Sequence, residues 1–576
     1  MAFYPAKIDD SYKRINDFSD LKNIYYHLKS YEDVVWNEKN IKENKPSVAD
    51  AAKIYVLISY LKTMDKSKFD RKKAYMSFFS DEADDIKKFI IDGLNGIQSQ
   101  LFKDIKIDVI KGSIYKIKKY FLENKKIKDI RGASEIIEYL NIDVTLNIVG
   151  EKFIEECVIY AGGGNVYIVL PEGKGKDVCK RLEEEYTNIA LTAMNAFEWE
   201  TTDLNTFFYD YKRISGELNR KLEWRKKIKI YPINPDSQLE ELNINGNKIS
   251  LKANTLRENG VVCDLCAIRD AKYLISSPDG QVPVCPSCLR KNRVGKDKSN
   301  FANEFKSFTN KEAKSVKTLE DLKDDRGYVA VIYGDGNNMG NYVMNINNPF
   351  EMMYFSRTLD YITKKSVYES FAEVMKDDIR FEIIALGGDD IFVIVPAVYA
   401  LEVSKKIIEK FDGSFKNNIT MSIGVCIAKF NTPIGNMSDI AQNLLKNAKK
   451  KAKNLKNPAG TIDIKILEGN SFIDFDYIKE GLFPATVNEL ASYYEAIRKM
   501  KEKSIQKSQL YKLRYASETM EREEFELFYL YQNARTIKEL NKIVTEMFRG
   551  RTFTGLVNGV YSPWADICML WDYVRW

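Results

Sequence analysis

Residues 383–397, IIALGGDDIFVIVPA, set two glycines and two aspartates between two apolar runs. The apolar runs are rich in β-branched residues, which favour strands, and glycine accepts the positive φ angles of tight turns. The stretch therefore predicts a β-hairpin with Gly387 and Gly388 in its turn. A turn does not explain the neighbouring carboxylates of Asp389 and Asp390, which are either solvated turn residues or part of a metal site.

A second stretch repeats this pattern earlier in the chain. Residues 153–171, FIEECVIYAGGGNVYIVLP, predict a hairpin with Gly163, Gly164 and Asn165 at its tip. A strand precedes each hairpin and a helix follows it, the first helix being expected from about residue 174 to 197. The repeated order indicates an internal duplication of two βα units. Only the later copy carries acids at the tip, GGDD against GGGN.

The remaining sequence suggests five regions in an α+β multidomain protein. Residues 101–141 predict a strand, a helix, a loop at Arg131–Ser134 and another helix. Ser47 is a plausible N-cap for an apolar helix, and long amphipathic helices follow Leu482. The expected regions are 1–98 (helical), 99–235 (first βα unit), 236–322 (linker and cysteine module), 323–475 (second βα unit) and 476–576 (helical bundle).

Composition limits the possible chemistry. The net charge of +6 is mild for 576 residues, so nucleic-acid contacts would come from local basic patches. The first residues lack a signal-peptide pattern and no apolar run is long enough to span a bilayer, so we expect a cytoplasmic protein without membrane contact. His27 is the only histidine, which excludes His-pair and Ser-His chemistry within this chain.

Four cysteines form the strongest local signal. Cys263 and Cys266 are separated by two residues, as are Cys285 and Cys288, with 18 residues between the pairs. Two such pairs place four thiolates round one tetrahedral Zn²⁺ with a closed shell, which predicts a structural site. The other cysteines lie in apolar contexts and are expected to be buried packing residues, namely Cys157, Cys179, Cys426 and Cys568.

Three aspartates form a second constellation. Asp335 ends the apolar strand YVAVIYGDG, and Asp389 and Asp390 occupy the hairpin tip. If the strands are neighbours, the carboxylates converge at one edge, where two Mg²⁺ or Mn²⁺ ions could activate a hydroxyl and neutralise a leaving pyrophosphate. Lys449 and Lys453 share one face of a later helix and could reach a triphosphate, although such lysines usually form a solvated face.

The strand aspartate, the GGDD hairpin, a later strand with SIG and a helix with AK together resemble the ferredoxin-like palm domain of nucleotidyl cyclases and polymerases. With a degenerate upstream copy, a four-cysteine module and a helical C-terminal region, residues 100–576 resemble the large palm-domain subunit of type III CRISPR effector complexes. The fold class implied is two palm domains, a zinc module and helical ends.

This resemblance implies a function and roles for particular residues. The second palm would join ATP into cyclic oligoadenylates when guide RNA pairs with target RNA, within a complex that contains small effector subunits. Asp335, Asp389 and Asp390 match the metal-binding acids. The residues matching nucleotide contacts are Gly387, Gly388, Ser422, Lys449 and Lys453, with Gly163, Gly164 and Asn165 of the silent first palm near a second nucleotide.

Two departures and two alternatives accompany the resemblance. Many members begin with an HD nuclease domain, but this sequence has no His-Asp motif, so we expect no HD-type DNase activity. Members often carry a second acid two residues after the strand aspartate, where this chain has Asn337. The alternatives are a diguanylate-type cyclase, disfavoured by GGDD and the duplication, and a non-catalytic scaffold, disfavoured by the retained acids.

Overall fold

The structure is a computed structural model, and its residues fall into two compact units. It describes residues 48–574 apart from 80–83, 92–101, 230–238, 245, 278–279, 297–298, 468–481, 536–539, 541 and 544–562. One unit comprises the residues up to Asn300 with Asn338–Lys364 and Ile384–Asp389, and the other comprises the rest. His27 and the expected N-cap Ser47 lie outside the described residues.

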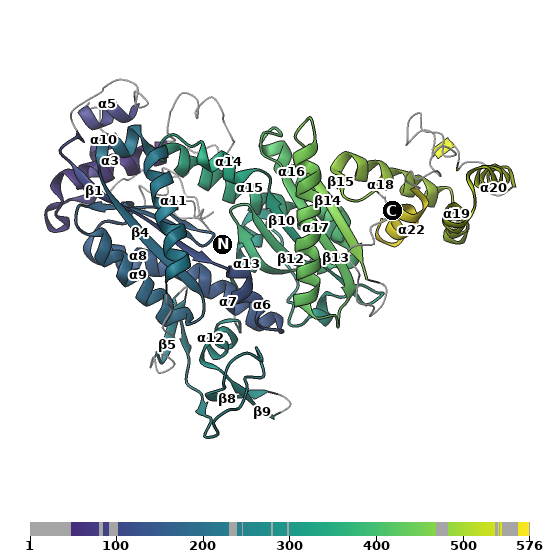
Figure 1. Ribbon diagram of the computed structural model, residues 1–576, viewed down its shortest axis with the longest axis horizontal. Helices are drawn as coiled ribbons and strands as arrows, with labels where there is room; N and C mark the ends of the chain where they lie inside the picture. Colours follow the sequence, from purple (N-terminus) through teal and green to yellow (C-terminus); the bar gives the residue numbers. More distant parts are fainter. Residues whose placement is uncertain are drawn as a thin grey trace. The chain divides into compact units, whose positions relative to one another are not determined.

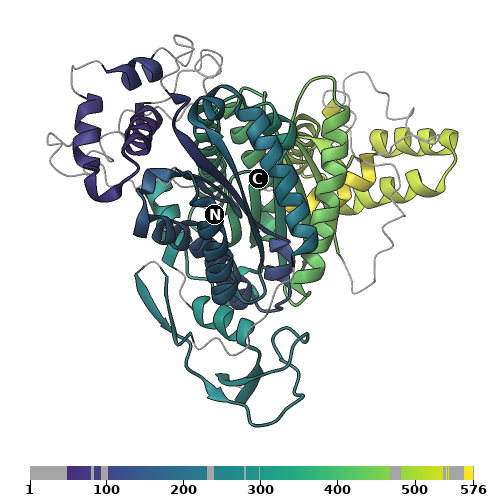
Figure 2. The ribbon, with the colours of Figure 1, turned by 60° about the vertical axis from the view of Figure 1, so that its left-hand side comes forward.

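The first large sheet has four strands in the order β2-β3-β1-β4 (Figure 1). These are β1 (Lys106–Tyr115), β2 (Val158–Gly162), β3 (Asn165–Pro171) and β4 (Met194–Asp203). Strand β1 is central and pairs antiparallel with both β3 and β4. Between the strands lie α6 (Ile117–Leu122), α7 (Ile127–Tyr139), α8 (Thr145–Lys152) and α9 (Gly175–Ala190). The chain therefore follows a β-α-β-β-α-β order, and α9 and α11 (Tyr211–Ile228) pack against β1 and β4 (Figure 2).

The second large sheet contains the same order and extends it. The strands are arranged in the order β11-β12-β10-β13-β14-β15 across the sheet. Along the chain, the segment from β10 to β13 again has the order β-α-β-β-α-β. The strands are β10 (Tyr328–Gly336), β11 (Glu382–Gly387), β12 (Asp390–Pro396), β13 (Met421–Lys429), β14 (Thr461–Ile466) and β15 (Ala485–Thr486). The helices are α14 (Met339–Met344), α15 (Pro349–Met375), α16 (Ala397–Ser414) and α17 (Ile434–Asn454). Strands β10, β12 and β13 are buried along almost their whole length, which explains their continuous apolar sequences.

Two sequence expectations in the first unit are wrong. Helix α7 runs unbroken through Arg131–Ser134, where a loop is expected from Gly132. A Cβ atom at Gly132 would lie 1.9 Å from the carbonyl oxygen of Lys291 in α12 (Pro286–Val294), so glycine is needed here for close helix packing. The helix expected to reach residue 197 ends at Ala190, because Leu191 has a φ of 61° and Phe197 belongs to β4.

Smaller elements complete the two units. The cysteine module contains a two-stranded sheet of β5 (Glu241–Ile244) and β6 (Asn247–Ser250) and a three-stranded sheet of β7 (Asn254–Thr255), β8 (Tyr273–Ser277) and β9 (Gly280–Val284). The helices outside the sheets include α3 (Val48–Thr63), α4 (Arg71–Phe79), α5 (Asp85–Ile91), α10 (Leu204–Tyr209), α13 (Ser299–Thr309), α18 (Val487–Glu502), α19 (Lys507–Thr519), α20 (Arg522–Arg535) and α22 (Pro563–Leu570). Among the described helices, none combines the length and the apolarity needed to cross a bilayer.

Candidate functional site

Two aspartates occupy neighbouring positions at one end of the second sheet. Strands β10 and β12 are antiparallel, and their pairing extends to Gly334 opposite Ile391. Asp335 follows Gly334 and Asp390 precedes Ile391, so both carboxylates are carried at the same end of adjacent strands. Asp389 is half-buried and directly precedes Asp390, which is exposed. This register places Asp335 and Asp390 on adjacent strands, whereas the convergence of the three carboxylates on a metal stays a prediction.

Lys449 of α17 contacts this end of the sheet. Its Nζ lies 2.7 Å from Oδ2 of Asp335 and donates a hydrogen bond of 2.9 Å to the carbonyl oxygen of Gly336. The two side chains are 33% and 28% exposed, so solutes can reach the pair. Lys453 is exposed and lies four residues further along α17. Asp335 therefore has the ammonium group of Lys449 beside it. Because the lysine side chain is flexible, this ammonium can contact a polyanion that binds at the same edge.

A buried polar network fixes Asn337, which stands where a second acid is expected. Its Nδ2 donates to Oγ1 of Thr420 over 2.9 Å, and its Oδ1 accepts from the hydroxyl of Ser422 over 2.8 Å. The Ser422 hydroxyl also lies 2.8 Å from that of Thr461, and Ser422 is fully buried. We expect Ser422 at a nucleotide base from the sequence, but in this structure its hydroxyl supports Asn337 from within the sheet.

The turn that carries the acids is held by a residue that sequence reasoning missed. Gly388 has a φ of 59°, and its N–H donates a hydrogen bond of 3.1 Å to Oδ1 of Asp360 in α15. Asp360 is only 3% exposed, and Lys364, also buried, lies 3.4 Å from its other oxygen. In the sequence the pair resembles an ordinary solvated (i, i+4) pair, because nothing local indicates that this face of α15 is buried.

The first hairpin provides an internal comparison. Its Gly163 has a φ of 58°, close to that of Gly388 in the second hairpin. Asn165 pairs with Ser113 of β1, and these are the positions that Asp390 and Asp335 occupy in the second sheet. Gly164 has a φ of 80°, and a Cβ there would lie 2.9 Å from the carbonyl oxygen of Ile114. The equivalent end of the first sheet thus has a glycine with the same positive φ angle but carries no acids.

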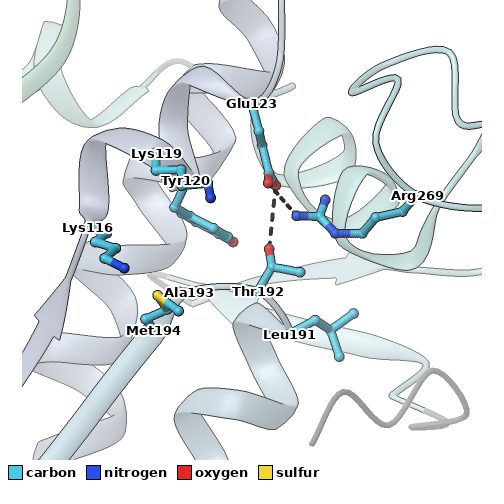
Figure 3. A pocket seen from close by; sticks show the side chains of 9 residues that line it. All are labelled: Lys116, Lys119, Tyr120, Glu123, Leu191, Thr192, Ala193, Met194 and Arg269. Atoms are coloured by element: carbon cyan, nitrogen blue, oxygen red, sulfur yellow. Dashed lines mark hydrogen bonds and ion pairs between the residues drawn. The ribbon is translucent and has the colours of Figure 1, made fainter. Parts of the chain in front are cut away.

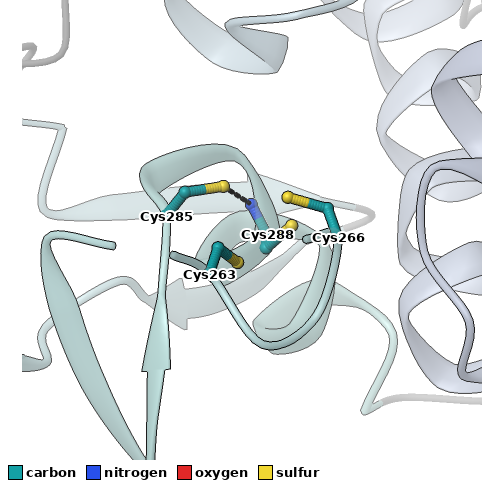
Figure 4. Close-up of side chains that lie close together, drawn as sticks. All are labelled: Cys263, Cys266, Cys285 and Cys288. Carbon is teal, nitrogen blue, oxygen red and sulfur yellow. Dashed lines mark hydrogen bonds between the residues drawn. The ribbon is translucent and has the colours of Figure 1, made fainter. Parts of the chain in front are cut away.

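The four cysteines of the module form one cluster (Figure 4). All are buried, and their sulfurs lie within 4.8 Å of one another. Four sulfurs bound at about 2.3 Å to a tetrahedral zinc ion would be about 3.8 Å apart, so the cluster fits that ion. Hydrogen bonds from the thiols of Cys285 and Cys288 lower the pKa of Cys263, which favours a thiolate. The other four cysteines are buried, as expected.

Side chains from outside the module contact these sulfurs. Nδ2 of Asn124, which follows α6, donates to Sγ of Cys288 over 3.2 Å. A guanidinium nitrogen of Arg269 lies 3.8 Å from Sγ of Cys266. Hydrogen-bond donors of this kind orient the thiolates that hold a metal and offset part of their negative charge. The site therefore includes Asn124 and Arg269 in addition to the four cysteines.

Comparison with known proteins finds a match for the region that contains most of the second sheet. The profile of the Cas10/Cmr2 second palm domain matches residues 328–457. The curated "CRISPR system single-strand-specific deoxyribonuclease Cas10/Csm1 (subtype III-A)" of Thermococcus onnurineus (strain NA1) is 22% identical over 400 residues. That match covers 57% of this chain and 51% of the relative, so the matched region spans about half of the relative's length.

Solved structures share the fold. Csm1 of T. onnurineus is 16% identical with a TM-score of 0.52, and the match covers 82% of this chain and 70% of that chain. The Csm1-Csm4 cassettes in complex with AMPPNP and with cA4 match with the same coverage, 17% and 18% identity and TM-scores of 0.51. The GGDD sheet thus lies in the region that matches the Cas10/Cmr2 second palm domain, and the chain is similar to Cas10/Csm1 and shares the fold of the solved Csm1 structures.

Proposed function

We propose that the second palm domain converts ATP to cyclic oligoadenylates by nucleotidyl transfer when target RNA is bound to the complex. The observation that carries the proposal is the β10–β12 register, which places Asp335 and Asp390 side by side in the region that matches the Cas10/Cmr2 second palm domain. The solved cassettes with AMPPNP and cA4 support a nucleotide substrate and a cyclic product.

Each residue of the site has a distinct task in this proposal. Asp335, Asp389 and Asp390 hold two Mg²⁺ or Mn²⁺ ions, for which clustered carboxylate oxygens are suitable ligands. When bound, the two ions supply activation of the attacking hydroxyl and neutralisation of the leaving pyrophosphate. Lys449 exchanges its contact with Asp335 for one with the triphosphate, and Lys453 extends the cationic edge. Gly387 and Gly388 leave room for the substrate to approach the backbone.

The remaining roles concern partners. The first sheet, with Gly163, Gly164 and Asn165 at its tip, has no acids for catalysis and helps to hold the second nucleotide. Guide RNA, target RNA and small effector subunits bind the same complex; solved relatives are Csm1-Csm4 cassettes, which supports a neighbouring Csm4-like subunit. The four-cysteine cluster binds a structural Zn²⁺.

The test is synthesis by the assembled complex. The purified complex, incubated with target RNA, ATP and Mg²⁺ or Mn²⁺, is expected to yield cyclic oligoadenylates by mass spectrometry. Asp389→Ala should abolish them, whereas Asp377→Ala, which removes an exposed aspartate outside the site, should not. A wild-type complex that binds target RNA but forms no product sensitive to Asp389→Ala would refute the proposal. Linear or GTP-derived products would instead favour a different cyclase chemistry.

The metal assignment has its own measurement. Elemental analysis of the purified protein is expected to find about one equivalent of zinc, and Cys285→Ala should reduce it. A value well below one equivalent in the wild-type protein contradicts the zinc assignment without affecting the synthetase proposal.

A further inference from the structure

A cavity of about 190 Å³ lies between the first sheet and the cysteine module (Figure 3). One wall is α6 with the residue before it, a second is the segment that leads into β4, and Arg269 of the module forms a third. The lining residues are Lys116, Lys119, Tyr120, Glu123, Leu191, Thr192, Ala193, Met194 and Arg269. All belong to the same compact unit, and none carries a role in the proposed synthesis.

The cavity has an excess of positive charge. Glu123 is its single lining carboxylate, and it already forms ion pairs with Arg269 and with the fully buried Lys291. Arg269 also lies 3.8 Å from Sγ of Cys266 in the cysteine cluster, and its ion pair with Glu123 compensates much of its charge. Lys116 and Lys119 are exposed at the rim and have no lining carboxylate left to pair with. The rim therefore favours an anion.

A buried donor points into the same space. Tyr120 is only 4% exposed, and its hydroxyl has no hydrogen-bond partner among the described residues. Figure 3 shows the hydroxyl directed toward the centre of the lining residues, on the side where Thr192 lies. Burial raises the pKa of Tyr120 well above its ordinary value, so the hydroxyl keeps its proton and can donate. Such an unpaired donor destabilises a fold by about 1–3 kcal/mol, which an acceptor oxygen in the cavity would offset.

The volume of the cavity and its apolar lining residues limit which anions can bind. Leu191, Ala193 and Met194 make the segment that leads into β4 largely apolar, and Thr192 is its one polar lining residue. Thr192 is engaged, since its hydroxyl lies 2.9 Å from that of Ser287. A volume of about 190 Å³ has room for a phosphate with part of a sugar or base but not for a folded RNA segment. A largely apolar segment beside a cationic rim suits a phosphate attached to a ring.

We propose that this cavity binds the phosphate group of a nucleotide, with Lys116 and Lys119 contacting the phosphate oxygens and the Tyr120 hydroxyl donating to one of them. The nucleotide is either free or the terminal residue of an RNA strand. The cavity shares no lining residue with the GGDD hairpin, and the proposal does not require the proposed synthesis. It would make the first palm-like domain a nucleotide-recognition element in its own right.

Binding to the full-length protein tests the proposal. Inorganic phosphate, AMP and a short RNA with or without a 5′-phosphate are titrated by calorimetry without added divalent cation, so that the GGDD acids do not hold phosphate through metal. We expect AMP or the 5′-phosphorylated RNA to bind, and the better of the two identifies the source of the phosphate. Failure of every probe to bind at millimolar concentration overturns the proposal.

Variants separate a ligand site from a structural cluster. Tyr120→Phe removes one hydroxyl and is expected to weaken binding about tenfold, as expected for a hydrogen bond to a charged group, with unchanged or raised thermal stability. The double variant Lys116→Ala/Lys119→Ala should weaken binding at least tenfold and reduce its salt dependence. Lys118→Ala, an exposed lysine of the same helix outside the lining, serves as the matched control.

Two results contradict the assignment. Equal affinity in Tyr120→Phe, in the double lysine variant and in the wild type shows that any bound nucleotide occupies another place. Equal loss of binding in Lys118→Ala shows a general charge effect. Asp389→Ala should retain binding at this cavity while losing cyclic product, so the two proposals can fail independently.

Discussion

Replacing Lys449 by methionine should separate catalysis from stability. Methionine keeps most of the aliphatic stem and removes the ammonium that lies 2.7 Å from Asp335 and 2.9 Å from the Gly336 carbonyl oxygen. Both side chains of the ion pair are about a third exposed, so the pair contributes only about 0–1 kcal/mol to the free energy of unfolding. Thermal stability should therefore change by a few degrees at most.

The expected loss of activity is much larger. A charge-assisted contact from Lys449 to the triphosphate is worth about 1.5–3 kcal/mol, which corresponds to about 10- to 150-fold in the rate of cyclic oligoadenylate formation. The assay measures initial rates of product formation by the complex with target RNA and, in parallel, the thermal unfolding of the purified subunit. Lys450→Met, one residue along the same helix and exposed, is the control and should keep the wild-type rate.

Two outcomes would refute this reasoning. A rate within threefold of wild type in Lys449→Met shows that the ammonium does not act on substrate. A loss of unfolding free energy greater than about 3 kcal/mol shows instead that the pair is a structural contact and that its exposure has been misjudged.

Three further predictions concern the turn, the helix packing and the pH dependence of stability. Asp360→Ala removes the acceptor for the Gly388 N–H and should lower the rate of cyclic product formation at least tenfold while RNA binding persists; an unchanged rate contradicts a positioning role. Gly132→Ala should lower the unfolding midpoint because its Cβ would meet a backbone oxygen at 1.9 Å, whereas Gly150→Ala, with nothing within 4 Å, should raise stability by up to about 1 kcal/mol, and equal effects contradict the packing argument. Burial raises the pKa of the Asp412 carboxyl from 3.8 to about 7. The folded state therefore binds this proton more tightly than the unfolded state does. The resulting stabilisation of the fold is fully present below pH 4 and is lost as the pH rises through 7. Denaturant unfolding between pH 4.5 and 8 should show that decline, and Asp412→Asn should flatten it.

The elements predicted well are those whose local sequence pattern is compatible with only one kind of structure. The GGDD hairpin combines strand-forming runs with turn glycines, and the structure places its strands at residues 382–387 and 390–396. Helix α15 (Pro349–Met375) likewise begins at a proline, a residue that favours the first turn of a helix. The paired cysteine spacing likewise leads directly to the observed cluster.

The failures have a common physical cause, which is that contacts distant in sequence override local preference. Gly132 favours a loop locally, but it lies in a helix because α12 approaches too closely for any side chain. Phe197 continues a pattern that locally favours a helix. In the structure it belongs to β4 instead, where it pairs with Gly112 of the central strand β1. Asp360 lies 28 residues before Gly388, and its contact with the turn depends on the burial of α15, which no local sequence feature reports.

The matching hairpins mean that the acids at the second tip are not required for the turn itself. Gly163 and Gly388 adopt the same left-handed conformation, and the first tip folds with Gly164 and Asn165 where the second has Asp389 and Asp390. The chain thus contains its own template for an inactive site. Exchanging the second tip for the first, by Asp389→Gly and Asp390→Asn, uses a tip sequence that already occurs in this fold and, if the proposed role of the acids holds, is expected to give an inactive subunit that still assembles.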